Sequence, residues 1–111
     1  MSVTAAQARK LALSFEDASE RPHVDRAAFR TSRRIFATLA GDGRDINLGF
    51  DPALQEFFCE QAPQAFTRLP GGWGEMGATR CDLRAVDKST LQSALKAAHA
   101  LAMPKPNKAR K

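Results

Sequence analysis

The fold of this 111-residue chain is decided by residues 21–50, which read RPHVDRAAFRTSRRIFATLAGDGRDINLGF. Apolar and polar residues alternate over residues 34–39 and again over residues 45–50, a pattern typical of strands with one buried face. Gly41-Asp42-Gly43 lies between the two runs, and an Asp-Gly pair favours a tight hairpin turn. Because residues 24–30 form a further run before the first alternation, the stretch predicts a three-stranded antiparallel meander.

Capping residues mark the starts of three predicted helices. Thr4 and Gln7 have the spacing of a capping box, in which each side chain bonds to the other's backbone N–H. Asp51 before Pro52 is a favoured helix start, because the carboxylate caps free N–H groups and proline fits the first helical position. Asp87 is the third N-cap. The predicted helices cover residues 4–15, residues 52 to about 62, and residues 88–102.

Two further strands are predicted between the second and third helices, at residues 66–69 and 79–84. The resulting order is α-β-β-β-α-β-β-α. This order predicts an α+β fold, an antiparallel sheet of about five strands with three helices on one face. The other face of the sheet would then be exposed to solvent or available for binding.

The composition indicates one domain followed by a basic tail. The chain carries 17 Lys and Arg residues against 12 Asp and Glu residues, a net charge of +5. Four of the basic residues follow Met103 without an acid, which leaves 13 basic and 12 acidic residues in the rest of the chain. We therefore expect one domain over residues 1–103 and a disordered, basic tail over residues 104–111.

The sequence also predicts where the protein resides. No apolar run approaches the roughly 18 to 20 residues that span a bilayer. Charge at Arg9 and Lys10 interrupts the N-terminus before the apolar segment of a signal peptide can form. Cys59 and Cys81 are expected to be buried or half-buried thiols rather than a disulfide. We therefore expect a cytoplasmic protein without a membrane partner.

The segment Gly72-Trp73-Gly74-Glu75-Met76-Gly77 matches the pattern G-x-G-x-x-G. A dinucleotide site needs these glycines between a strand and a helix of a βαβ unit, whereas here a strand is predicted to follow. The context therefore favours a glycine-rich hairpin over a cofactor site. Trp73, the only tryptophan, either packs back onto the core or stacks against a nucleobase, and packing is the commoner fate.

Arginines are the strongest functional candidates, because a guanidinium group binds phosphate oxygens in a bidentate manner without a deep pocket. The alternative is a solvated surface on which Asp25, Asp45 and Asp82 neutralise part of the charge. The candidate arginines are Arg26, Arg30, Arg33, Arg34, Arg80 and Arg84.

Catalytic and metal-binding patterns are missing from the sequence. His23 and His99 do not stand at metal-ligand spacing with Cys59 or Cys81, and no Cys-x-x-Cys pair occurs. His99 follows Leu95 by four residues and is expected to border the core of the last helix. We therefore expect no metal, no cofactor and no enzymatic activity.

Several short motifs occur together in the order typical of one known family. They are Phe29-Arg30, Arg34-Ile35-Phe36-Ala37-Thr38-Leu39, Trp73-Gly74, Gly77, Thr79 and the small-residue final helix. Over about residues 5–103 the chain resembles the MmcQ/YjbR family. The resemblance implies an α+β fold of the frataxin-like kind and a "double wing" mode of DNA binding.

The leading hypothesis is a non-enzymatic DNA-binding or DNA-associated protein without strong sequence specificity. In this hypothesis the turns near Ser32 and at Gly72–Gly77 act as wings against the phosphate backbone. The residues expected to contact nucleic acid are Arg30, Arg33, Arg34, Trp73, Arg80 and Arg84. Two alternatives stay open: a protein-interaction module that uses the exposed sheet face or an edge strand, and small-molecule binding beside Trp73.

Overall fold

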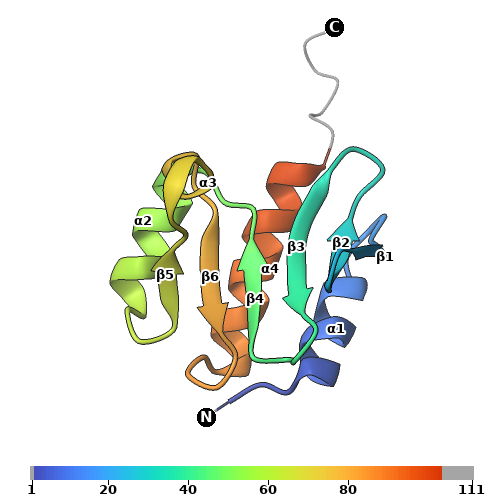
Figure 1. The fold of residues 1–111 in the computed structure, drawn as a ribbon, viewed down its shortest axis with the longest axis horizontal. Helices are drawn as coiled ribbons and strands as arrows, with labels where there is room; N and C mark the ends of the chain where they lie inside the picture. Colours follow the sequence, from blue (N-terminus) through green and yellow to red (C-terminus); the bar gives the residue numbers. More distant parts are fainter. Residues whose placement is uncertain (1, 104–111) are drawn as a thin grey trace, which may run out of the picture.

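The structure, a computed structural model, describes residues 2–103, and the basic tail expected at residues 104–111 lies outside the described residues. Six antiparallel strands form one sheet in the order β1-β2-β3-β4-β6-β5 (Figure 1). The elements are α1 (Ala5–Leu13), β1 (Ser19–His23), β2 (Arg26–Arg30), β3 (Ile35–Ala40), β4 (Asp45–Leu48), α2 (Pro52–Gln61), β5 (Phe66–Arg68), α3 (Gly71–Glu75), β6 (Thr79–Asp82) and α4 (Lys88–Ala102).

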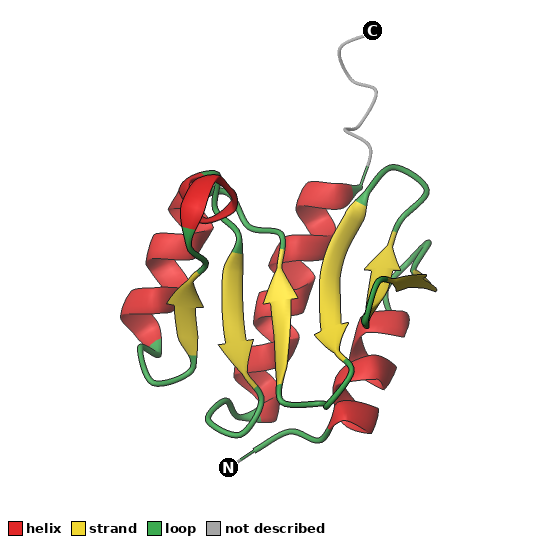
Figure 2. Cartoon of the chain, in the orientation of Figure 1, coloured by secondary structure: helices red, strands yellow, loops and turns green. Residues whose placement is uncertain are grey.

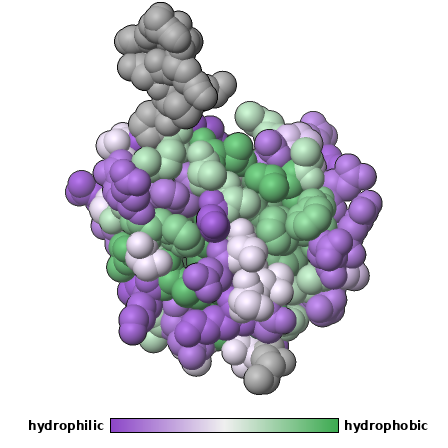
Figure 3. All heavy atoms as spheres, turned by 180° about the vertical axis from the view of Figure 1, so that it is seen from behind, coloured by the Kyte–Doolittle hydropathy of each residue, from purple (hydrophilic) through white to green (hydrophobic). Residues whose placement is uncertain are grey.

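The helices divide the molecule into two layers. Helices α1, α2 and α4 lie behind the sheet, and the short helix α3 lies at one end of it (Figures 1 and 2). Seen from the helix side, the surface is a mixture of hydrophilic and apolar areas (Figure 3). The opposite face of the sheet is left uncovered by these three helices, and we call it the open face. The α+β class, with helices on one face of an antiparallel sheet, is confirmed.

Two neighbouring rows of side chains show how the sheet separates core from surface. Successive side chains along a strand point to opposite faces, so residues aligned across strands form rows. One row is buried in the core and consists of Leu39, Ile46, Cys81 and Phe66. The next row, which we call the polar row, belongs to the open face and consists of Thr38, Asn47, Arg80 and Thr67.

The three predicted N-caps are confirmed. Thr4 and Gln7 form the capping box at the start of α1, with bonds of 2.9 and 3.1 Å. Asp51 accepts a hydrogen bond from the backbone N–H of Leu54, and Asp87 does the same for Thr90. These caps fix where the three long helices begin.

Strand β1 corrects the predicted strand number, which is six rather than about five. The first strand was expected at residues 24–30, but Ser19–His23 already form β1. All five residues of β1 are exposed, so the strand has no buried face and no alternation for a sequence pattern to reveal. Pro22 is tolerated there because β1 is an edge strand, which pairs only with β2.

The prediction of a glycine-rich hairpin at Gly72–Gly77 is wrong, because Gly71–Glu75 form α3. The described chain therefore has four helices rather than three. Gly74 and Gly77 allow close backbone approach, since a Cβ atom on either would collide with backbone atoms. A Cβ atom on Gly74 would lie 1.6 Å from the carbonyl oxygen of Leu69. Gly77 ends the segment at φ 118°, a region that favours glycine. None of the helices within residues 2–103 is long and apolar enough to cross a membrane.

Candidate functional site

A groove of about 450 Å³ lies on the open face. His23 and Arg26 of the β1–β2 hairpin contribute to its lining, and Trp73 and Met76 contribute from α3 at the other side of the sheet. Residues of β3 and β4 lie between these two borders. A hollow of this volume is within the range of pockets that accept small molecules or parts of larger ligands, about 300 to 1,000 Å³. We call it the open-face groove.

Helix α3 presents two large apolar side chains to solvent. Trp73 is 75% exposed and Met76 is 71% exposed, although large apolar side chains usually pack inward. The buried side of α3 is occupied by Gly74, whose carbonyl oxygen accepts a hydrogen bond of 2.9 Å from Nε2 of Gln55 on α2. The same Nε2 donates to the carbonyl oxygen of Ala78. Backbone therefore fills the inner side of α3, and Trp73 and Met76 are left on its outer side.

The ionisable residues that line the groove are all basic. Arg26, Arg34 and His23 line it, and no aspartate or glutamate does so within the described chain. Arg34 is exposed at the start of β3, and no carboxylate of residues 2–103 lies within ion-pairing distance of its guanidinium group. Such an arginine can bind an anionic ligand without first releasing an internal partner.

One carboxylate holds two arginines in place beside the groove. Asp45 pairs with Arg26 at 2.9 Å and with Arg80 at 3.3 Å, and its side chain is only 14% exposed. Arg26 also donates to the side-chain and backbone oxygens of Thr38 at 2.9 and 2.8 Å. Its guanidinium group is therefore well ordered. Arg80 keeps about half of its side chain exposed, at 53%, and carries the less restrained charge of the two.

Asn47 occupies the centre of the polar row, aligned with Thr38 on one side and Arg80 on the other. It also lines the open-face groove. Its Oδ1 atom is buried and has no hydrogen-bond partner among the described residues. Because buried polar atoms normally have a hydrogen-bond partner, this oxygen is an acceptor on the open face that no described residue satisfies.

The predicted site residues fall into two groups. Trp73 and Arg34 line the open-face groove, and Arg80 lies beside it in the polar row. Arg33 instead donates hydrogen bonds to the carbonyl oxygens of Leu101 and Ala102 at the end of α4. Arg30 donates to the carbonyl oxygen of Thr31 and lines a different hollow.

Arg84 lies after β6, away from α3, and its closest carboxylate is that of Asp82 at 3.8 Å. The structure therefore brings three of the six predicted residues to the open face and does not bring the other three to the same groove.

Sequence reasoning missed several features of the groove. Met76 was not singled out, although its spacing of three residues from Trp73 would place both on one side of a helix. That signal was hidden because the segment was predicted to be a hairpin. His23 and Asn47 were not assigned to the open-face groove. They line the same groove because of strand β1 and the order of strands in the sheet, neither of which the sequence shows.

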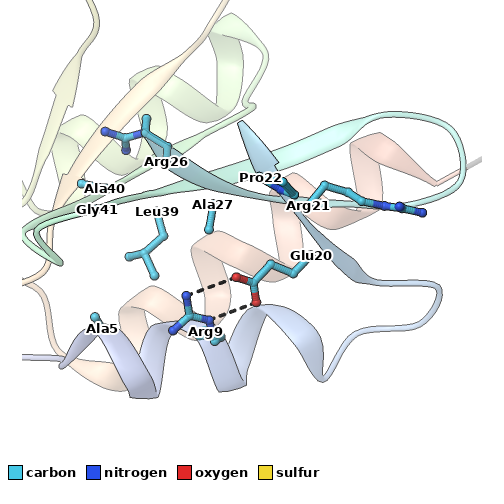
Figure 4. A pocket seen from close by; sticks show the side chains of 10 residues that line it. All are labelled: Ala5, Arg9, Glu20, Arg21, Pro22, Arg26, Ala27, Leu39, Ala40 and Gly41. Carbon is cyan, nitrogen blue, oxygen red and sulfur yellow. Dashed lines mark hydrogen bonds and ion pairs between the residues drawn. The ribbon is translucent and has the colours of Figure 1, made fainter. Parts of the chain in front are cut away.

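A second hollow lies between α1 and the β1–β2 hairpin (Figure 4). Arg9 and Glu20 point toward one another across it and form two hydrogen bonds of 3.0 and 3.1 Å. Arg21 extends away from this pair. The charges that face each other here already satisfy one another, so this hollow offers less to an anionic ligand than the open-face groove does.

The titratable groups with displaced pKa values lie outside the groove. Burial, together with the nearby Asp82 and Asp45 carboxylates, raises the pKa of the Cys81 thiol to about 12. Burial also raises the pKa of Cys59. Both cysteines are free thiols, one buried and one half-buried, as expected. No cluster of three or more His, Cys, Asp or Glu side chains in the described part of the chain is placed to hold a metal ion.

His99 borders the core, as expected. It is 8% exposed and stacks on Phe15 with ring centroids 5.1 Å apart, and it lies nearly perpendicular to the ring of Phe36 with centroids 5.3 Å apart. Its Nε2 lies 2.6 Å from the carbonyl oxygen of Glu16, which requires this nitrogen to carry the proton and donate. The ring therefore connects α4 to the end of α1 and is unavailable to a ligand.

Comparisons with known proteins point to one family. The model of the YjbR family matches residues 13–101. The crystal structure of Deinococcus radiodurans protein DR2400, which contains the domain DUF419, superposes with a TM-score of 0.76 at 18% identity. The alignment covers 92% of this chain and 80% of that one, and it supports the shared fold. A comparison with curated protein sequences finds no match.

Proposed function

This chain belongs to the YjbR family, and we propose that it is a DNA-binding protein that contacts DNA with the open face of its sheet. In this proposal Arg34 and Arg80 bind phosphate, and Trp73 contributes an aromatic contact at the border of the groove. Sequence specificity is not expected, because the proposed contacts are with phosphate and with aromatic surfaces that every base offers.

One observation carries the proposal. An indole that is 75% exposed borders a groove whose ionisable lining residues, His23, Arg26 and Arg34, are all basic. Exposed aromatic rings combined with basic side chains are the usual means by which proteins bind unpaired nucleotides without reading a particular sequence. A solvated arginine surface alone would not account for the neighbouring tryptophan and methionine.

The open-face groove favours binding over catalysis. Of the groups whose pKa values are displaced, Cys81 is in the core row, Asp87 caps α4, and Asp17 bonds to Ser32. None of them lines the groove. The two free thiols agree with a reducing compartment, so the proposal places the protein in the cytoplasm.

A salt titration of duplex affinity tests the proposal. For a labelled duplex of about 20 base pairs, log K should fall linearly with log salt, by about 0.9 per phosphate contact. Arg34→Gln should weaken binding and lower that slope by about 1. Arg44→Gln removes another exposed arginine, which lies outside the groove and pairs with Asp42 at 3.9 Å, and should change neither quantity.

The result can also reject the proposal. Affinity that does not respond to salt, or an Arg34→Gln variant that binds like the Arg44→Gln variant, would contradict phosphate binding at this face. A circular-dichroism melt of each variant excludes misfolding as the cause of any loss.

A second candidate function is protein interaction at the edge strand β1. Its five residues are exposed and pair on one side only, and Val24 in the adjoining turn is 97% exposed. An unpaired edge of this kind can accept a strand of another protein, although Pro22 and the charges of Glu20 and Arg21 oppose such pairing. Binding of a protein partner that survives Arg34→Gln and Trp73→Ala would favour this function over DNA binding.

A further inference from the structure

We infer that the open-face groove accepts a single nucleic-acid strand, with an unpaired base stacked on Trp73 and the adjoining phosphate bound by Arg34. This inference rests on the proposed function and deepens it, because it specifies which form of nucleic acid the groove fits. It differs from a wing-like contact with the outside of a duplex.

The exposure of Trp73 points to a base rather than to a sugar-phosphate chain. With 75% of the residue exposed, the indole offers an open ring surface to a planar partner. In a duplex each base is covered above and below by its neighbours, so stacking on it requires unstacking first. An unpaired base has a free face and gains from stacking without that penalty.

The lining of the groove agrees with bases lying in it. Half-buried apolar residues, including Ile35, Leu69 and Ala78, line the groove between its borders, and Met76 adds an exposed thioether beside Trp73. Apolar surface of this kind gains free energy when it is covered by an aromatic base. It gains little from a duplex backbone, whose outer surface is charged and hydrated.

Only part of the predicted positive charge belongs to the open face. Arg34 lines the groove and Arg80 lies beside it, whereas Arg33 is engaged by the end of α4 and Arg84 lies near Asp82. A duplex would be held best by charges on both outer turns. A single strand needs only charges beside one backbone, which Arg34 and Arg80 can supply.

The test compares three DNA probes of about 12 nucleotides: a single strand of thymidines, a duplex, and an abasic strand that keeps the phosphates but lacks bases. Because Trp73 is the only tryptophan, its fluorescence reports contact directly. We expect quenching by the single strand, weaker binding of the duplex, and weak binding of the abasic strand without quenching.

Substitution of Trp73 separates stacking from charge. Trp73→Ala should weaken single-strand binding by about 5- to 150-fold, measured by anisotropy of a labelled probe. Trp73→Phe should retain most of the affinity, and Phe57→Ala serves as a matched control because Phe57 is an exposed aromatic on α2, outside the groove. Neither substitution at position 73 should affect binding of the abasic strand.

The outcomes distinguish the inference from the function on which it rests. Duplex binding that is tighter than single-strand binding, salt-dependent and unchanged by Trp73→Ala would overturn the inference and leave DNA binding at Arg34 and Arg80 standing. Equal binding of the abasic and thymidine strands would overturn it as well. If none of the three probes binds at about 50 mM salt, both the inference and the proposed function are wrong.

Discussion

The turn between β2 and β3 and the segment around α3 both connect strands at the same end of the sheet, but they use their side chains in opposite ways (Figure 1). In the β2–β3 turn, Thr31 is buried and donates a hydrogen bond of 2.8 Å to Ala102, and Arg33 donates to Leu101 and Ala102. Around α3, backbone packs inward through Gly74, while Trp73 and Met76 face solvent.

These two regions separate the residues that stabilise the fold from those exposed for binding. The β2–β3 turn satisfies the free carbonyl oxygens at the end of α4, a position where helices leave acceptors unpaired. Helix α3 packs against the rest of the protein through its backbone and Gly74, so its large side chains are not needed for packing. Substitutions in the first region should therefore alter stability, and substitutions of the exposed side chains in the second should alter binding alone.

The largest expected effect is that of Gly74→Ala. The added Cβ would lie 1.6 Å from the carbonyl oxygen of Leu69, so the backbone must move and we expect a loss of about 3 kcal/mol or more in the free energy of unfolding. Gly72→Ala is the matched control: its Cβ would meet nothing within 4 Å, and alanine in a helix should stabilise by about 0.5 kcal/mol. Urea unfolding measures both. Equal effects of the two substitutions would refute the close-packing account of α3.

A smaller loss is expected for Thr31→Val. The change keeps the shape of the side chain but leaves the carbonyl oxygen of Ala102 without its hydroxyl donor, which should destabilise the protein by about 1 to 3 kcal/mol. Thr31→Ser keeps the hydroxyl and should lose less. Melting temperatures of the two variants test this explanation. A lower melting temperature for Thr31→Ser than for Thr31→Val would contradict the hydrogen bond as the cause.

Acid should weaken the contact between Asp17 and the β2–β3 turn. Hydrogen bonds from Ser32 hold the pKa of Asp17 below its usual value of about 3.9, chiefly the bond from its backbone N–H and to a smaller extent the one from its hydroxyl. The folded pKa is lower than the unfolded one, so this contact stabilises the protein above the unfolded pKa and is lost as pH falls through the folded pKa. Asp17→Asn suits the positive φ of 62° at this position and should be less stable than the parent at neutral pH.

Melting temperatures between about pH 3 and pH 7 test this dependence. The difference in melting temperature between the parent and the Asp17→Asn variant should become smaller toward low pH. The variant Glu16→Gln controls for the loss of one negative charge. A gap that is constant across the range would mean that the charge of Asp17 does not contribute.

The smallest effect on stability is expected for Trp73→Ala and Met76→Ala. Both side chains are more than two-thirds exposed, so each substitution should change the free energy of unfolding by less than about 0.5 kcal/mol. The same proteins should bind nucleic acid more weakly. Urea unfolding that shows a loss above about 2 kcal/mol for Trp73→Ala would mean that the indole is a structural anchor after all.

Much of the fold could be predicted because its signals are local. Asp51 and Asp87 cap their helices at the predicted positions, and the alternation of Ile46 and Leu48 with Asp45 and Asn47 marks β4. Strand β1 could not be predicted in this way, because it is exposed on both sides. Helix α3 was hidden by its glycines, which are typical of turns, and the close approach of Gly77 to Phe50 joins two segments that the sequence alone does not bring near.

The site was predictable in part. Arg34 and Trp73 were expected from their chemistry, and the structure places both on the open-face groove. Arg33 and Arg34 are adjacent in sequence, yet one binds the end of α4 and the other lines the groove. No sequence pattern separates two such neighbours, since the difference arises from how the β2–β3 turn meets a helix nearly 70 residues later.

The central claim is that ligands bind at the open face, and amide chemical-shift mapping with an added oligonucleotide tests it most directly. We predict that the amides of Thr38 and Asn47 and the indole N–H of Trp73 shift in a saturable manner, while amides of α2 and α4 stay in place. Shifts confined to the helix layer, or no shifts while the oligonucleotide is bound, would contradict the claim.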